Sequence, residues 1–520
     1  MLAVVPQPPN NFGRAVITTD VEEITKDNVC AVLQKAMTTH SQNSTRIDWL
    51  YQYYKGDQPV LNRVKEVRPE INNPVVANIA YELVEFKTGY LIYEPVQYVS
   101  SADDKGVTEK VEELNRYMSI QDKEAQDTFL AWWFHICGTA YRMVLPNKLK
   151  QKGDKQAPFE IYTLDPRYTF VVRRNDLGKT PIMSVQYVTK EDGKMIFSIY
   201  TKDRYFEVSD QISVIKEDDN PLGGIPVIEY PANIARLGCF EIVLSLMDAI
   251  NEIESNRTDA VQQFVQALLL FHNTDITSDD FAKLREQGAL KFKDIDPSMR
   301  AEIQYLVEEL NQDQTQTVVD NMYQRILNIC GMPNRSGGSG RSTSDTGKAV
   351  VYRDGWGAAE YRAKLTERCF RSSEKEFLEL VLKICRDLSD IDLQLNQFDI
   401  RMPRRNYDNV KEKADTLVMM LNNDKIAPKL AFEHCGMFID PETAYISSKK
   451  YAEEVMAQTI ANMKQIAGVQ NDSATGVSRG TGRSSPIYSS AWSEGSSVVK
   501  RKGKKSGMID RDGDGIVGEQ

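Results

Sequence analysis

The stretch 236–273, RLGCFEIVLSLMDAINEIESNRTDAVQQFVQALLLFHN, decides the architecture of this chain. It contains no proline, and no glycine follows Gly238, so one helix over residues 239–272 could extend for about 50 Å. The ends of this helix are apolar, whereas its middle, NEIESNRTDAVQQ, is polar on most faces. A helix with such a middle seldom forms the core of one compact domain. The pattern predicts a long helix that packs beside copies of itself around a water-filled space.

The residues before this helix predict an α+β half. Residues from about 20 to 55 have helical spacing that closes at Gly56, and residues 79–91 place Ile79, Leu83, Phe86 and Tyr90 on one helical stripe. Four later segments alternate β-branched and aromatic residues with turn signals, which predicts a meander of antiparallel strands. These segments are PFEIYTLDPRYTFVVRRN, TPIMSVQYVTK, KMIFSIYTKDRYFEVSD and ISVIKEDDNPLGGIPVIEY.

The residues after the long helix are mostly helical. A mixed segment over about 274–308 contains GALKFKDI, a predicted strand, and helices are predicted over 312–331 and 346–388. DLQLNQFDIRMPRRN predicts a strand. Residues 409–465 are predicted to be helical, with a helix start at Asp440-Pro441-Glu442. The residues after about 466 are rich in Ser and Gly, which predicts a disordered tail.

Composition excludes several classes of protein. No run of eighteen apolar residues exists among the 520, so no membrane-spanning helix is predicted. Seven cysteines without a C-x-x-C pair predict free thiols in a reducing compartment. The four histidines are not spaced like metal ligands, so neither a metal site nor a cofactor is predicted. The net charge of −10 is unlike that of a protein that grips DNA tightly.

The loop GSGRSTSDTGKAVV, residues 338–351, superficially resembles a phosphate-binding loop. The template G-x-x-x-x-G-K-[ST] requires Gly at position 342 and Ser or Thr at position 349. The chain has Ser342 and Ala349 there, and the residues before the loop predict a helix where the template needs a strand. Nucleotide hydrolysis is therefore not predicted. A nucleic-acid processing ATPase stays an alternative hypothesis, as does a cytosolic helical scaffold protein.

Three segments resemble the wing-domain signature of portal proteins of tailed bacteriophages, of the type found in long-tailed phages of Gram-positive hosts. They are YYKGDQPVLNR (53–63), NNPVVANIAYELVEFKTGYLIYEPVQY (72–98) and ICGTAYRMVLPN (136–147). Asn78, Gly89, Tyr90 and Pro95 fit the pattern, whereas Tyr93 stands where the family usually has Gly.

The long helix also resembles the family's first stem helix. The positions that match are Leu246, Asp248, Asn251, Ser255 and Asp259, and TGKAVVYRDGW (346–356) resembles the family's entry into the helix after its tunnel loop. The resemblance covers roughly residues 45–465, and the order and spacing of its motifs are more specific than any motif alone.

The resemblance implies a portal fold and a ring of usually twelve subunits. It implies an α/β wing, stem helices, a small α/β clip between them, and a helical crown. The expected boundaries are an N-terminal arm 1–19, wing 20–235, stem helix 236–273, clip 274–311, stem helix 312–332, tunnel loop 333–348, long helix and wing strand 349–408, crown 409–465, and disordered tail 466–520.

The function that the resemblance implies is a non-enzymatic channel for double-stranded DNA at one capsid vertex, used in packaging and ejection. The implied partners are further copies of the chain, the terminase large subunit, scaffold and major capsid proteins, and a head–tail adaptor. Assembly is expected in the host cytoplasm. The expected DNA contacts are Asn334, Arg335, Arg341 and Lys348 of the tunnel loop, and the expected docking residues of the clip are Lys283, Arg285, Lys291 and Lys293.

Three further motifs leave alternatives open. Asp510, Asp512 and Asp514 match the start of a calcium loop, but the chain ends before the bidentate Glu that closes such a loop, so a solvated acidic terminus is favoured. The KRKGKK stretch, 500–505, is compatible with a DNA contact and equally with a solubilising tail. The aromatic patch AWWFH, 131–135, is expected to anchor core.

Overall fold

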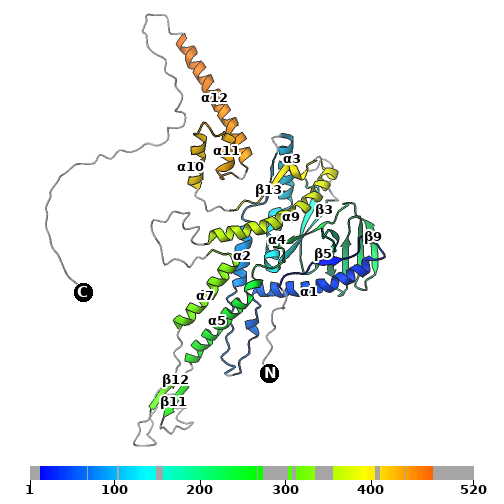
Figure 1. Cartoon of the computed structure of the whole chain (residues 1–520), viewed down its shortest axis with the longest axis vertical. Coiled ribbons are helices and arrows are strands. Elements are labelled where there is room, and N and C mark those ends of the chain that lie inside the picture. Colours follow the sequence, from blue (N-terminus) through cyan, green and yellow to red (C-terminus); the bar gives the residue numbers. More distant parts are fainter. Residues whose placement is uncertain are drawn as a thin grey trace, which may run out of the picture. The chain divides into compact units, whose positions relative to one another are not determined.

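The structure, a computed structural model, describes residues 12–66, 68–101, 105–147, 156–265, 268–272, 302–306, 312–333, 355–389, 391–404, 410–438 and 440–471 (Figure 1). The chain forms two compact units, Met1–Ile446 and Ser447–Gln520. The first unit contains both helices and sheets, so the predicted α+β class is confirmed.

Four helices form most of the first part of the chain: α1 (Val29–Lys55), α2 (Ile79–Leu91), α3 (Lys105–Ile120) and α4 (Lys123–Cys137). The 3-10 helix η1 (Pro59–Asn62) follows α1. α1 ends where predicted, at Gly56, whose φ of 100° favours glycine. Strand β1 (Ile17–Thr19) lies within the predicted N-terminal arm. α1 begins later than predicted, because residues 20–28 between β1 and α1 form bends and turns.

The largest sheet has six strands in the order β1-β5-β6-β7-β8-β9. Strand β1 runs parallel to β5, and β5 to β9 form the predicted antiparallel meander. The bounds of the meander strands are β5 Thr169–Arg174, β6 Pro181–Thr189, β7 Met195–Tyr200, β8 Arg204–Ser209 and β9 Val214–Asp219. Buried side chains of α1 and of this sheet share one hydrophobic cluster, which includes Leu33, Phe170 and Ile199.

Two of the predicted meander segments belong to another sheet. β4 (Phe159–Leu164) and β10 (Val227–Pro231) both pair with β3 (Thr139–Pro146), in the order β10-β3-β4. The meander prediction is wrong for these two strands, because their partner β3, which follows directly on α4 at Gly138, is not among the predicted strands. The pairing of β10 with β3 also joins segments that are distant in sequence, and such a pairing leaves no local signal.

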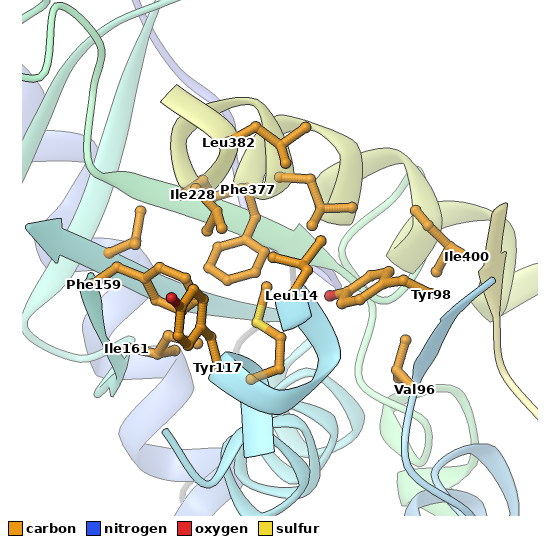
Figure 2. Packing of buried hydrophobic residues seen from close by; sticks show 14 of the residues in the cluster. Val96, Tyr98, Leu114, Tyr117, Phe159, Ile161, Ile228, Phe377, Leu382 and Ile400 are labelled. Atoms are coloured by element: carbon orange, nitrogen blue, oxygen red, sulfur yellow. The ribbon is translucent and has the colours of Figure 1, made fainter. Parts of the chain in front are cut away.

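The long helix α9 (Trp356–Leu388) packs on this three-stranded sheet. Figure 2 shows Phe377 and Leu382 of α9 over Ile228 of β10, with side chains of α3 and β4 nearby. The pair of β2 (Gln97–Ser100) with β13 (Phe398–Arg401) contributes Tyr98 and Ile400 to the same core. The strand predicted after α9 is therefore confirmed, and it returns to the first hundred residues of the chain.

The long helix predicted over 239–272 is shorter in the structure. A 3-10 turn, η2 (Glu241–Val243), leads into α5 (Leu244–Val265), and residues Leu268–His272 form strand β11. Strand β11 pairs with β12 (Glu302–Leu306), so the apolar end of the predicted helix is a strand. The helix α7 (Gln312–Cys330) agrees with its prediction and packs on α5.

The helices α10 (Val410–Leu421), α11 (Pro428–His434) and the start of α12 (Pro441–Asn471) share a small core that includes Leu417, Phe432 and Cys435. α12 begins as predicted, since Asp440 accepts hydrogen bonds from the backbone N–H groups of Glu442 and Thr443. It continues to Asn471, beyond the predicted start of the tail at 466. In the described part of the chain no helix is both long and apolar enough to cross a membrane.

Candidate functional site

The predicted DNA-contacting residues Asn334, Arg335, Arg341 and Lys348 lie outside the described residues. The predicted clip residues Lys283, Arg285, Lys291 and Lys293 lie outside them too, as do the acidic residues Asp510, Asp512 and Asp514. The structure describes β11 just before the predicted clip, β12 within it, and α7 and α9 on the two sides of the predicted loop. The site that can be built from described residues lies on α5.

One face of α5 carries three buried polar side chains at four-residue spacing, namely Asn251, Ser255 and Asp259. We call them the acceptor row. They are 2%, 0% and 3% exposed. Because residues four apart lie on the same face of a helix, the sequence itself aligns them. The prediction that the polar middle of this helix faces water is wrong for these three residues.

The acceptor row binds an extended segment of the same chain, residues 72–78, which we call the strap. The backbone N–H groups of Asn73, Val75 and Ala77 donate to Asp259 Oδ1 at 2.7 Å, Ser255 Oγ at 2.9 Å and Asn251 Oδ1 at 2.9 Å. Figure 1 shows this region as the blue loop between α1 and α2 that reaches down toward α5. Every second residue of the strap is thus fixed by every fourth residue of α5.

The sequence of the strap suits this role. Pro74 has no N–H group and stands between two donating positions, where no donor is needed. The proline also favours an extended backbone at Asn73, and the β-branched Val75 and Val76 favour it further along. Asn78 ends the strap in the left-handed region, with φ 37°, and its side chain accepts from the N–H of Tyr81 at the start of α2.

Asp259 is the most highly connected member of the acceptor row. Its Oδ2 also accepts from Arg63 and, at 2.9 Å, from Lys65, and its Oδ1 accepts from the side chain of Asn73 at 3.0 Å. Burial alone would raise the pKa of this carboxyl, but the hydrogen bonds from Lys65 and Asn73 and the charge of Arg63 lower it below its usual value. Asp259 is therefore a carboxylate at neutral pH that pairs with two cations.

The other two members of the row have second partners. Asn251 donates its side-chain amide to Gln58, which follows α1, and Ser255 donates its hydroxyl to the Asn251 carbonyl at 2.7 Å. One turn earlier on α5, Asp248 accepts from the Tyr53 hydroxyl at 2.8 Å. Burial raises the pKa of Asp248, and the hydrogen bond from Tyr53 opposes this. Of the matched positions, Asn251, Ser255 and Asp259 bind the region between α1 and α2, and Asp248 binds the last turn of α1.

The entry into α5 is a close crossing of three chain segments. Ideal Cβ atoms on Gly13, Gly138 and Gly238 would lie only 2.2, 2.0 and 2.2 Å from the backbone oxygens of Ala235, Arg236 and Ile136. The buried Glu241 accepts from the N–H groups of Gly13 and Gly238 and pairs with Arg14 at 2.7 Å. The N-terminal residues thus help to fix the direction in which α5 leaves the sheets.

A second buried polar cluster fixes α9. Glu374 is fully buried and accepts from the hydroxyls of Tyr98 and Tyr230, at 2.6 and 2.7 Å, from Arg142 at 3.1 Å and from Lys123 at 2.9 Å. Asp127 also pairs with Arg142 and Lys123. Burial alone would raise the pKa of Glu374, but the charges of Lys123 and Arg142 outweigh it and lower the pKa.

The predicted role of the AWWFH patch as core is confirmed. Ala131, Phe134 and His135 are buried, and Trp132 and Trp133 pack against a hydrophobic cluster. All seven cysteines lie among the described residues and are free thiols. Within the ranges that the structure describes, no three His, Cys, Asp or Glu side chains come together as metal ligands.

Sequence reasoning found the α5 residues of this site but missed their partners Gln58, Arg63, Lys65 and Asn73. The sequence does contain one signal of this contact. Pro74 stands between residues whose backbone N–H groups can donate, and α5 carries polar residues at four-residue spacing that can accept. The register between them depends on tertiary structure.

The comparisons with known proteins give one family. A family model described as "Phage portal protein, SPP1 Gp6-like" matches residues 33–466. No curated protein matches the sequence. Among similar solved structures is a chain from the neck of an empty gene transfer agent (GTA) particle computed with C6 symmetry, with 10% identity and a TM-score of 0.42 over 69% of this chain and 90% of that one. A chain from the virion of the native GTA particle has the same identity and TM-score, over 75% and 93% of the two chains.

Proposed function

The chain belongs to the SPP1 Gp6-like family of phage portal proteins, and from that premise we propose that it forms a ring, usually of twelve copies, whose channel conducts double-stranded DNA. Proteins of this family are structural components of the virion and serve as head–tail connectors. The observation that carries the proposal is the match of one family model across residues 33–466. Three further observations support the proposal.

The first point is the division of the chain into portal regions. We assign the wing to 20–235 with the strand near 392–405, after an N-terminal arm at 1–19, and the stem to α5 and α7. The clip would be 274–311, the tunnel loop 333–348 and the crown 409–465. The antiparallel β11–β12 pair supports the clip assignment, because β11 precedes the clip, β12 lies within it, and their pairing brings the two ends of the intervening segment together.

The second point is the chemistry of the outward faces of α5 and α7. Many of their exposed side chains are polar but uncharged: Ser245, Asn256, Thr258 and Gln263 on α5, and Gln314, Gln316, Thr317, Asn321 and Asn328 on α7. Such a surface is well hydrated without holding phosphates. A conduit for moving DNA benefits from this, because every tight phosphate contact would have to be broken as the duplex advances.

The third point is the net charge of −10 per chain. A ring of such chains repels a polyanion except where basic residues are concentrated, which favours a weak and salt-sensitive contact with DNA. The basic residues Arg335, Arg341 and Lys348 supply such a contact in this proposal, together with Asn334.

The proposed partners follow from the portal role. The clip residues Lys283, Arg285, Lys291 and Lys293 would meet first the terminase large subunit and then a head–tail adaptor. Scaffold and major capsid proteins would hold the ring at one capsid vertex after assembly in the host cytoplasm. The proposed role is not enzymatic, and the chain needs neither a cofactor nor a metal for it.

Electron microscopy of the purified full-length chain tests the proposal. Rings with a central hole are expected, with scaffold protein added if the chain alone stays monomeric. A chain that stays monomeric over all salt concentrations, with and without scaffold, would contradict the ring. The rival ATPase hypothesis predicts ATP hydrolysis above background that is lost on Lys348→Ala, and the portal role predicts none.

A further inference from the structure

The contact between the strap and α5 depends on a match of two repeats. Backbone N–H groups on one side of an extended chain recur every two residues, or about 6.6 Å. Side chains on one face of a helix recur every four residues, or about 6.0 Å. The two repeats differ by roughly 0.6 Å per step, so three successive bonds form before the mismatch accumulates. Donors 73, 75 and 77 meet acceptors 259, 255 and 251 in reverse order.

This contact reaches the far half of α5. Asp259 lies six residues before Val265, where α5 ends, and β11 begins three residues after that. At the other end the strap continues into α2, whose side chains pack with those of α1 and the start of α5 in one cluster. The strap therefore connects the helices beside the sheets with the part of α5 that is farthest from them.

Asp259 binds both the strap and the segment that follows η1. Arg63 and Lys65 approach its Oδ2 from the chain that leaves η1, and Asn73 approaches its Oδ1 from the strap. Arg63 also donates from its Nη2 atom to Asn256 Oδ1 at 3.0 Å, and Asn256 lies one turn before Asp259 on α5. The side chains of Arg63 and Asp259 are only 8% and 4% exposed, so solvent and salt screen this pair poorly.

We propose that the strap holds the far half of α5, and with it the β11–β12 pair, in a fixed position relative to α1 and α2. Asp259 and Asn73 are the positioning residues. α7 supports one face of α5, and the strap supports another. The inference rests on the proposed portal function only in placing β12 in the clip and β11 directly before it.

Hydrogen–deuterium exchange on the full-length chain, followed by mass spectrometry, tests this proposal. Asp259→Asn removes the charge that binds Arg63 and Lys65, and Ser255→Ala removes the acceptor of the Val75 N–H. Asp320→Asn is the matched control, because Asp320 is an exposed carboxylate on α7 that accepts only a local bond from Gln316.

Asp259→Asn should speed amide exchange about tenfold in the strap, in α5 after about residue 252, and in β11 and β12, because losing a bond worth ~1.4 kcal/mol raises local opening by that factor. Residues 244–250, the six-stranded sheet and the Asp320→Asn control should exchange at the unchanged rate. Ser255→Ala should speed exchange at Val75.

Three outcomes would overturn the proposal: unchanged exchange in the strap, faster exchange confined to the strap, or faster exchange throughout the first unit. The measurement needs neither a ring nor DNA. Failure of this inference is therefore distinguishable from failure of the portal role, which electron microscopy tests separately.

Discussion

Glu374 shows how much one buried residue can decide. Its carboxylate accepts from two tyrosine hydroxyls and two cations contributed by β2, β10, β3 and α4. Four elements between residues 97 and 231, all distant in sequence from α9, therefore fix one position of α9. A buried charge network of this kind is costly to desolvate and stabilises the fold only when complete.

Glu374→Gln should lower the free energy of unfolding by about 3–5 kcal/mol, because it leaves the buried Arg142 and Lys123 with one carboxylate between them. Urea denaturation of the full-length chain measures this. Glu379→Gln, an exposed position on the same helix, should change the same quantity by less than about 0.5 kcal/mol. A loss for Glu374→Gln as small as that of the control would show that the network is not stabilising.

The same group has a predictable pH dependence. Since the pKa of Glu374 is lowered in the folded chain, its stabilising contribution is complete above its unfolded pKa of about 4.3. The contribution is then lost as the pH falls further below that value.

His135 and His40 give a pH dependence in a higher window. Burial lowers the pKa of His135 to about 3, with a smaller effect from the charge of Lys87, and burial lowers that of His40 to about 4 against a bond with the Arg167 carbonyl. Between pH 6.5 and about 4.5 the unfolded chain therefore binds protons that the folded chain does not. The free energy of unfolding consequently decreases as the pH falls through this range. Each histidine contributes up to about 1.4 kcal/mol per pH unit.

His135→Gln should make the slope of unfolding free energy against pH shallower between pH 6 and 4.5. The slope should decrease by up to about 1.4 kcal/mol per pH unit, which is the contribution of one histidine. Urea denaturation over this pH range measures it. The slope is the useful quantity, because the loss of the bond between His135 and Thr88 lowers stability at every pH. A slope equal to that of the unaltered chain would mean that His135 is protonated in the folded state.

At the scale of elements, Gly138 fixes how α4, β3 and the entry into α5 meet. Its φ of 82° is in the left-handed region, and a Cβ there would lie 2.0 Å from the Arg236 carbonyl oxygen. Gly193, in the turn between β6 and β7, has a nearly identical φ of 80° with no atom within 4 Å of its ideal Cβ. The two positions differ in steric contact and share the same backbone strain.

Gly138→Ala should cost more than about 4 kcal/mol or prevent folding, because the backbone of Arg236 cannot move away without displacing α5. Gly193→Ala should cost only the left-handed penalty of about 1–2 kcal/mol. Thermal and urea denaturation of both variants give the comparison. Equal losses would show that the crossing can relax, and that it does not fix the direction of α5.

At the scale of the whole molecule, the portal role requires parts that hold their shape and parts that follow moving DNA. The described residues that we assign to the wing and the stem are held by buried hydrogen bonds and ion pairs. The predicted contact loop, by contrast, carries glycine and serine around Arg335, Arg341 and Lys348. In the proposed ring, identical loops related by rotation cannot all match one helical duplex, so the loop conformation is expected to vary around the ring.

Replacing Arg335, Arg341 and Lys348 together by Ala should leave ring formation intact and impair DNA packaging or retention, through the loss of a few phosphate contacts per subunit. Gly337→Pro with Gly340→Pro should impair packaging more, because it stiffens the loop. Electron microscopy and a packaging assay check the two properties separately. Lost rings, or normal packaging with normal retention, would contradict the proposed DNA contact.

The sequence by itself determined the class of the fold, most of its elements and its family. Strands β5 to β9, helix α7, the C-terminal end of α1 and the start of α12 follow from local signals such as alternation, helical stripes, glycine and capping residues. The family resemblance rested on motifs such as Asp248, Asn251, Ser255 and Asp259, whose spacing is visible in the chain.

Only the tertiary structure decided what these residues bind. The polar middle of α5 predicts contact with water when the helix is considered alone. The strap buries one face of it, because alternate N–H groups of an extended chain need acceptors and the acceptor row supplies them. The pairing of β3 with β10, the return of β13 to β2 and the Glu374 network likewise join residues far apart in sequence. Local propensity carries no information about such partners, since register and burial are set when distant segments meet.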